Sequence, residues 1–243
     1  HRAVRSFERV AAALSEGPSG ALSRLSAVVD KFGRRVLRDE ASMMIVAGFE
    51  TTGTKACWAT YALACRPDIV AWLRPETDAV ISSDWRIDPT ALKAMPRTRA
   101  FVQEVLRLFP AAWWFARSAL TDCVLDDVPV KKGTSVLVCP WALHRQPALW
   151  DAPRTLDPMR FYDRGPPDKF AYIPFGIGPR VCLGQHLAMA ELIAITAMTV
   201  SAFELEPLSG AFEELIPSGG VTLGAPPNLS VRLHLRPQLR KVA

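Results

Sequence analysis

The stretch FGIGPRVCLG, residues 175–184, decides how this chain is interpreted. Cys182 follows a loop that contains two glycines and Arg180, and it precedes an apolar segment, 187–203, that we expect to be helical. A helix N-terminus carries partial positive charge and free N–H groups, which favour a thiolate over a thiol. Glycines let the backbone approach a flat, bulky ligand, and a guanidinium is suited to carboxylates. A buried structural cysteine at a strand-to-helix turn is the simpler alternative.

The same residues resemble the haem-binding loop of the cytochrome P450 family, the haem-thiolate monooxygenases. The family signature is Phe-x-x-Gly-x-Arg-x-Cys-x-Gly, and this chain fills every fixed position. The resemblance implies haem b (iron protoporphyrin IX) as cofactor, with Cys182 as the axial iron ligand. The other cofactor-binding residues that it implies in this loop are Phe175, Gly176, Gly178, Arg180 and Gly184. A dinucleotide-binding loop is excluded because the third glycine of its fingerprint is absent and no βαβ pattern surrounds it.

Composition indicates a globular protein without a membrane span. The 243 residues are 49% hydrophobic, enough for a sizeable core, and charges or glycines interrupt the apolar stretches before they reach membrane-span length. Five cysteines form no C-x-x-C pair, which favours a reducing compartment over disulfides or zinc. We therefore expect a cytoplasmic location, with any membrane anchor in an upstream segment. The net charge of +5 favours solubility or an acidic partner, and no basic run interleaved with aromatics indicates nucleic acid.

Hydrophobic periodicity and turn residues predict a mainly α fold with small antiparallel β-sheets. Two amphipathic helices, 2–14 and 21–32, are expected before a long helix at 39–65, which spans roughly 40 Å at about 1.5 Å per residue. Later elements are helices at 69–82 and 97–108, one small sheet of 123–125, 128–130 and 135–139, an irregular meander at 151–167, and a closing hairpin of 221–223 with 230–235.

The long helix carries an unusual polar group. Glu50 and two threonines follow Gly48 in an apolar stretch whose other charge is Lys55. A carboxylate there is costly unless it is used or paired, and pairing with an arginine in ordinary helix packing is the simpler explanation. The stretch also resembles the P450 central helix, Ala/Gly-Gly-x-Asp/Glu-Thr-Thr/Ser, which implies that Ala47 and Gly48 lie over the haem. It further implies that Glu50 and Thr51 are catalytic, with Glu50 relaying protons as a general acid and Thr51 holding oxygen and a water.

Glu104 and Arg107 are three residues apart, within pairing distance on one helix face. An exposed pair of this kind contributes little to stability. In the P450 family, Glu-x-x-Arg lies buried under the haem and is completed by the arginine of a Pro-Glu-Arg-Phe meander. Here Arg160 is present in this motif, but Met159 replaces the glutamate. The resemblance implies a triad of Glu104, Arg107 and Arg160 that serves folding and haem retention rather than catalysis.

The resemblance also implies residues around the haem edge. Arg117, ten residues after Arg107, is expected on a strand, where it would clamp the haem propionates together with Arg180. His144 is expected to be a structural or propionate-side residue, because the sixth iron position must stay open for oxygen.

In the P450 family the turn at this point contacts substrate above the haem, so the resemblance implies a tight apolar pocket at Trp113-Trp114-Phe115 that recognises aromatic groups, with core packing as the alternative. Because a strand alternates its faces, at least one of the three rings is expected to point away from the pocket. The resemblance also implies a second substrate-contact region at 218–221. The expected substrate-pocket residues are Met44, Ala112, Trp113, Trp114 and Val221.

The resemblance covers essentially the whole chain but only part of a P450 domain. We therefore expect residues 1–243 to form the C-terminal haem-binding portion of one domain, without its N-terminal portion. The implied function is a haem-thiolate monooxygenase that inserts one oxygen atom of O₂ into an apolar small molecule, with electrons from an acidic ferredoxin, flavodoxin or reductase. One alternative is a truncated, catalytically incompetent fragment that acts as a haem-binding or interaction module. Another is a haem-thiolate isomerase or dehydratase, which the Glu50–Thr51 pair disfavours.

Overall fold

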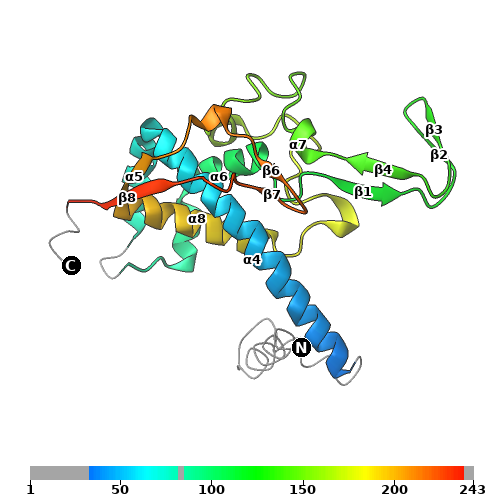
Figure 1. Cartoon of the computed structure of the whole chain (residues 1–243), viewed down its shortest axis with the longest axis horizontal. Helices are drawn as coiled ribbons and strands as arrows, with labels where there is room; N and C mark the ends of the chain where they lie inside the picture. Colours follow the sequence, from blue (N-terminus) through cyan, green and yellow to red (C-terminus); the bar gives the residue numbers. More distant parts are fainter. Residues whose placement is uncertain (1–32, 82–84, 238–243) are drawn as a thin grey trace. The chain divides into compact units, whose positions relative to one another are not determined.

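The protein is described by a computed structural model that covers residues 33–81 and 85–237 (Figure 1). The chain divides into two compact units, residues 1–51 and residues 52–243. The helices expected at 2–14 and 21–32 lie outside the described residues. Helix α4, Arg34–Cys65, belongs to both units and begins earlier than the expected residue 39.

Four helical segments build the core of the second unit. These are the C-terminal part of α4, α5 (Pro67–Val80), α6 (Pro96–Leu108) and α8 (Gln185–Ala202), with α8 packed against α5 and α6. Trp58 of α4 stacks on Phe109, with ring centroids 3.7 Å apart, and Phe212 meets both rings edge-on. Aromatic contacts of this kind stabilise a core beyond the burial of their surface.

Prolines mark the points at which two of these helices begin. Pro67 and Pro96 occupy the first positions of α5 and α6, where a missing backbone N–H costs nothing. Glu76 of α5 then caps α6 from outside. Its carboxylate accepts hydrogen bonds from the backbone N–H groups of Arg97 and Thr98, both at 2.8 Å. The helices expected at 69–82 and 97–108 are therefore present, with each start moved to its proline.

The described strands form four two-stranded antiparallel sheets. The pairs are β1 (Phe115–Ser118) with β4 (Ser135–Val138), β2 (Cys123–Leu125) with β3 (Val128–Val130), β5 (Phe203–Pro207) with β8 (Val231–Leu235), and β6 (Ser218–Gly219) with β7 (Leu223–Gly224).

Two expected pairings are therefore wrong. The single sheet of 123–125, 128–130 and 135–139 is two separate sheets, because β4 pairs with β1 across the β2–β3 hairpin. The closing hairpin is also incorrect, since β8 pairs with β5 and β7 with β6. Alternation along a strand encodes which face is buried, but it does not encode the partner strand.

Short helical turns complete the described chain. They are η1 (Pro89–Ala94), α7 (Pro140–Leu143), η2 (Arg160–Arg164), η3 (Gly178–Arg180) and η4 (Phe212–Glu214). The meander at 151–167 contains η2 as its regular element. The mainly α fold class with small antiparallel sheets is confirmed. Among the described residues, no helix has both the length and the apolar character that crossing a bilayer requires.

Candidate functional site

Cys182 lies in a tight loop that leads into α8. Its backbone N–H donates to the carbonyl of Phe175 at 2.9 Å, which folds the loop back on itself. Gly176 and Gly178 have φ values of 73° and 76°, in the left-handed region that other residues rarely adopt. Gly184 caps α8, and a Cβ at this position would lie 3.9 Å from Cys182 Sγ. The glycines therefore shape the loop and keep the approach to the exposed thiol clear.

The surroundings of this thiol fit a flat, apolar cofactor that contains iron. Leu183 is 100% exposed, and Ile177 and Val181 in the same loop are also exposed, an arrangement that normally marks a ligand or partner surface. Arg180, at the end of η3, is exposed as well. A sulfur donor suits iron, the apolar rim suits a macrocycle, and the guanidinium suits carboxylates. The residues present therefore fit haem.

Glu50 and Thr51 lie in the part of α4 that belongs to the first unit. Thr51 Oγ1 donates to the carbonyl of Ala47 at 2.6 Å, the back-bonding that a threonine can make within a helix. The exposed residues of this segment include Met44, Ala47, Gly48 and Glu50. Because Cys182 belongs to the second unit, the grouping of these residues with the thiol in one site stays a prediction.

Glu104, Arg107 and Arg160 meet in the interior of the second unit. Arg107 Nε and Nη2 donate to the two carboxylate oxygens of Glu104 at 2.7 and 2.8 Å. Arg160 Nε lies 3.4 Å from Glu104 Oε1, and the N–H of Asp157 donates to the same oxygen at 2.9 Å. Burial raises the pKa of Glu104, while the hydrogen bonds and charge of Arg107 oppose this shift. This bidentate pair, with both side chains 0% exposed, is a structural element rather than a surface ion pair.

The remaining donors of Arg107 hold the meander. Its Nη1 donates to the carbonyls of His144 and Pro153, both at 2.7 Å, and its Nη2 donates to the carbonyl of Thr155 at 3.1 Å. The guanidinium also lies 5.1 Å from the ring centroid of Trp150. One buried side chain therefore ties α6 to three separate points of a segment with little regular structure of its own.

His144 continues this network toward the Cys182 loop. Its Nε2 accepts a hydrogen bond from the backbone N–H of Ile173 at 2.9 Å, and its Nδ1 lies 3.1 Å from the carbonyl of Arg107. Burial lowers the pKa of His144 to about 4, so the ring is neutral and Nδ1 carries the hydrogen. The carbonyl of Ile173 in turn accepts from the N–H of Gly176. Because both ring nitrogens are used, His144 acts here as a structural residue of the loop.

Arg117 lies on β1 with an exposed side chain. Its guanidinium stacks 4.7 Å from the centroid of the Phe115 ring, and Nη1 donates to the carbonyl of Ala116 at 2.9 Å. Like Arg180, it presents a guanidinium at the surface of the second unit. Their joint action on two propionates stays a prediction.

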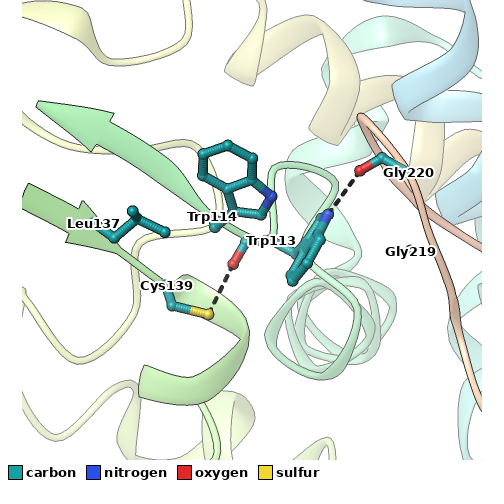
Figure 2. A pocket seen from close by; sticks show the side chains of 6 residues that line it. All are labelled: Trp113, Trp114, Leu137, Cys139, Gly219 and Gly220. Atoms are coloured by element: carbon teal, nitrogen blue, oxygen red, sulfur yellow. Dashed lines mark hydrogen bonds between the residues drawn. The ribbon is translucent and has the colours of Figure 1, made fainter. Parts of the chain in front are cut away.

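An apolar pocket of about 560 Å³ lies where three segments of the second unit meet (Figure 2). Trp113 and Trp114 line it with their rings at 83° to each other, and the other lining residues are Leu137, Cys139, Gly219 and Gly220. Trp113 Nε1 donates to the carbonyl of Gly220 at 3.0 Å, and Cys139 Sγ donates to the carbonyl of Trp113 at 3.3 Å. The polar group of Trp113 is therefore satisfied, which leaves its ring available for apolar contacts.

The second wall of the pocket comes from the loop 218–221. Gly219 and Gly220 of this loop line the pocket, whereas Val221, which is 95% exposed at the tip of the β6–β7 turn, and Ala112 do not. The ring that lies outside the lining is Phe115, which packs under a guanidinium.

Sequence reasoning missed Leu137 and Cys139, because their position beside Trp113 depends on the pairing of β4 with the distant strand β1. It also missed the role of Lys55, which is buried in the core. A single charge in an apolar helix was the available signal for that residue.

Comparison with known proteins identifies the family. The sequence model of the family described as Cytochrome P450 matches residues 21–231. The chain is 33% identical to Protein LUTEIN DEFICIENT 5, chloroplastic, of Arabidopsis thaliana, over 82% of this chain and 34% of that protein. It is 33% identical to human Cytochrome P450 4V2, over 76% of this chain and 37% of that protein. The crystal structure of the cytochrome P450DA heme domain superimposes with a TM-score of 0.75 at 26% identity, over 82% of this chain and 44% of that one.

The chain belongs to the cytochrome P450 family, a family of haem-dependent oxidoreductases. It spans about a third to two-fifths of the length of the curated relatives described above. The match to a P450 heme domain agrees with the buried triad, the meander and the loop that carries Cys182.

Proposed function

We propose that this chain supplies the haem-thiolate part of a monooxygenase that inserts one oxygen atom of O₂ into an apolar small molecule. The observation that carries the proposal is the Cys182 loop, in which an exposed thiol, an apolar rim and two glycines at positive φ precede a helix. The family supports the same chemistry. Haem, when bound, supplies the reductive activation of O₂.

The residues of the chain divide the remaining work. Cys182 would hold the haem iron through its thiolate and tune it electronically, and Arg180 and Arg117 would hold the propionates with planar guanidinium groups. Thr51 Oγ1 donates its hydrogen to the carbonyl of Ala47, so toward a water of the relay this oxygen would act as an acceptor. Glu50 delivers protons from solvent as a general acid.

The Trp113 pocket supports a proposal for the class of substrate, and the net charge of the chain supports a proposal for the class of electron donor. The pocket beside Trp113 and Trp114 favours a flat, apolar substrate, because indole rings offer large faces for stacking. The net charge of +5 favours an acidic partner such as a ferredoxin, a flavodoxin or a reductase.

The absorption spectrum of the reduced, carbon-monoxide-bound chain tests the assignment of the cofactor. We expect the strongly red-shifted Soret band of thiolate ligation in the unmodified chain and in Cys123→Ser, which alters another exposed cysteine. Cys182→Ser should lose the band. If the band persists in Cys182→Ser, another residue ligates the iron. If the unmodified chain takes up no haem, a binding or interaction module becomes the better interpretation.

The number of product molecules formed per NAD(P)H consumed tests the proton relay. With a competent redox partner, Thr51→Ala should keep haem binding but divert electrons to peroxide, while Thr52→Ala should stay closer to the unmodified protein. Unchanged coupling in Thr51→Ala would remove this residue from the mechanism. Product formed without any NAD(P)H consumption would indicate an isomerase or dehydratase instead.

A further inference from the structure

Among the described residues of the second unit, Lys55 is the lysine that is buried in the core. Lys55 of α4 is 1% exposed, and its neighbours one turn later, Trp58 and Ala59, are buried as well. Its Nζ donates to the backbone carbonyl of Leu223 at 2.6 Å. Burial lowers the pKa of this amine to about 7. Burial of an amine costs free energy unless the amine has a hydrogen-bond acceptor. The bond to Leu223 supplies that acceptor, and its position in the fold indicates what the lysine does.

Leu223 belongs to the hairpin that forms one wall of the Trp113 pocket. In the β6–β7 register, Leu223 lies opposite Gly219, and Gly219 and the following Gly220 line the pocket. Lys55 therefore bonds to the strand directly beside the pocket wall, although it does not line the pocket itself. Figure 2 shows the two glycines facing Trp113 from this hairpin.

This hairpin has little strength of its own. Each strand is two residues long, and an isolated hairpin of even ordinary length is marginal in water. Its attachments to the remainder of the unit include three hydrogen bonds between described residues. The N–H of Leu223 donates to the carbonyl of Ala111 at 3.0 Å, Trp113 Nε1 donates to Gly220, and Lys55 donates to Leu223.

The three attachments are not equivalent. The bonds with Ala111 and Trp113 join the hairpin to the segment that carries the two tryptophans, which is the opposite wall of the pocket. With these two bonds alone, both walls could move together. The bond from Lys55 ties the hairpin to α4, the helix that also contains Glu50 and Thr51. A methionine or leucine in the core could fill the same space, but it has no donor for the carbonyl of Leu223.

We propose that Lys55 is a positioning residue for substrate specificity, which fixes the Gly219–Gly220 wall of the pocket by anchoring Leu223 to α4. The proposal rests on the proposed function, since it assigns the substrate-binding role to this pocket. It predicts a preference for flat apolar molecules that fit between the tryptophans and a rigid glycine wall. Loss of the anchor widens the pocket and weakens that selection without changing any residue that lines it.

Hydrogen exchange of the backbone amides in the full chain tests the anchor directly. Lys55→Met keeps an apolar stem of similar length and removes the donor, and Lys93→Met alters an exposed lysine as the matched control. We expect amides in 216–225 to exchange about tenfold faster in Lys55→Met, the factor that one net hydrogen bond of ordinary strength represents. Exchange in the β5–β8 pair, which Lys55 does not bond to, should stay unchanged, as should the Lys93→Met protein throughout.

Binding of 1-naphthol, measured by equilibrium dialysis, gives the second readout. Lys55→Met should bind this flat probe several-fold more weakly, whereas a residue with a purely structural role would lower stability without a selective effect on the pocket. Faster exchange spread evenly over the unit, with 1-naphthol binding unchanged, would overturn the proposal. Lys55→Leu gives the same test if Lys55→Met does not fold. A hairpin that exchanges as fast as an unprotected turn in the unmodified chain would also contradict it.

Hydrogen exchange and 1-naphthol binding need neither haem nor turnover. The experiments can therefore distinguish failure of this proposal from failure of the proposed function. A loosened hairpin in a chain without the thiolate spectrum would leave Lys55 as the anchor of a binding pocket. The thiolate spectrum with an unchanged hairpin would retain the enzyme and remove the role of Lys55.

Discussion

Removal of the Glu104 carboxylate should destabilise the second unit strongly. In Glu104→Ala, Arg107 keeps its bonds to three backbone carbonyls but loses both bonds of the bidentate pair, and the N–H of Asp157 loses its acceptor. Arg107 is 0% exposed, so its charge cannot turn to solvent instead. Breaking a buried pair from one side costs about 3–5 kcal/mol, which is a large part of the roughly 5–15 kcal/mol that holds a typical domain together.

The chain contains a matched control for this experiment. Arg74 Nη2 and Glu204 Oε2 are also 2.7 Å apart, but their side chains are 26% and 50% exposed. Both pairs join an arginine to a glutamate at the same shortest distance, but the exposed pair has one bond where the buried pair has two. An exposed pair of this kind contributes about 0–1 kcal/mol, so Glu204→Ala should cost far less than Glu104→Ala.

Urea unfolding followed by far-UV circular dichroism measures both costs. With a slope of about 1–3 kcal/mol per M, the midpoint for Glu104→Ala should fall by one to several M, whereas that for Glu204→Ala should move by about 0.5 M or less. Glu104→Gln, which keeps the shape and one acceptor oxygen, should lie between Glu104→Ala and the unmodified chain. Equal costs for Glu104→Ala and Glu204→Ala would falsify the view that burial gives this pair its importance.

Three further predictions concern stability. Burial lowers the pKa of Lys55 from 10.5 to about 7, so the unfolded chain binds more protons between these values and stability should rise with pH by up to about 1.4 kcal/mol per pH unit. Urea unfolding at pH 7 to 10 should show a smaller rise in Lys55→Met, and parallel profiles would contradict this. Burial also lowers the pKa of His144 from 6.5 to about 4, so stability should fall as the pH drops through that window, and His144→Phe should lack this contribution in the same assay. Glu76→Ala removes the external cap of α6 and should cost about 1–2 kcal/mol, with no loss in an exposed-site variant such as Glu214→Ala.

Local sequence patterns predicted the helices because helices are held by local bonds. The apolar stretches of α4, α6 and α8 and their flanking prolines or glycines all lie within one segment each. Helix α5 begins two residues before the expected residue 69, at Pro67, which separates it from the end of α4. A proline is compatible with both roles, since its fixed φ suits the first helical turn.

Strand pairing could not be predicted in the same way. β1 and β4 are separated by the β2–β3 hairpin, and β5 and β8 enclose η4 and the β6–β7 pair. The two-residue strands β6 and β7 contain three glycines or serines and have no alternation that could be recognised. The β1–β4 and β5–β8 pairings are set by contacts between distant segments. The β6–β7 pairing is local, but its strands are too short to be recognised, and the pocket wall at Gly219 and Gly220 depends on it.

In the candidate site, too, features set by adjacent residues could be predicted, whereas features set by contacts between distant segments could not. The loop around Cys182 could be recognised because its glycines and its arginine are adjacent in sequence. Lys55 could not be assigned, because helical periodicity does not reveal that a carbonyl 168 residues away lies at 2.6 Å from its amine. The sequence marks a lone charge as unusual, and only the packing determines whether that charge has an acceptor.

The buried polar residues connect α6 to the candidate iron ligand through a continuous series of hydrogen bonds. Arg107 is held by Glu104, its carbonyl faces His144 Nδ1, and His144 Nε2 accepts from Ile173. Ile173 lies two residues before Phe175, whose carbonyl accepts from the N–H of Cys182. The bonds of Glu104, Arg107 and His144 lie in the buried interior, where a satisfied network is rigid and a broken one is costly, whereas the last bond lies in the exposed loop of Cys182. In the proposed enzyme the triad would act without touching a substrate, because it helps to hold the loop that carries the Cys182 sulfur.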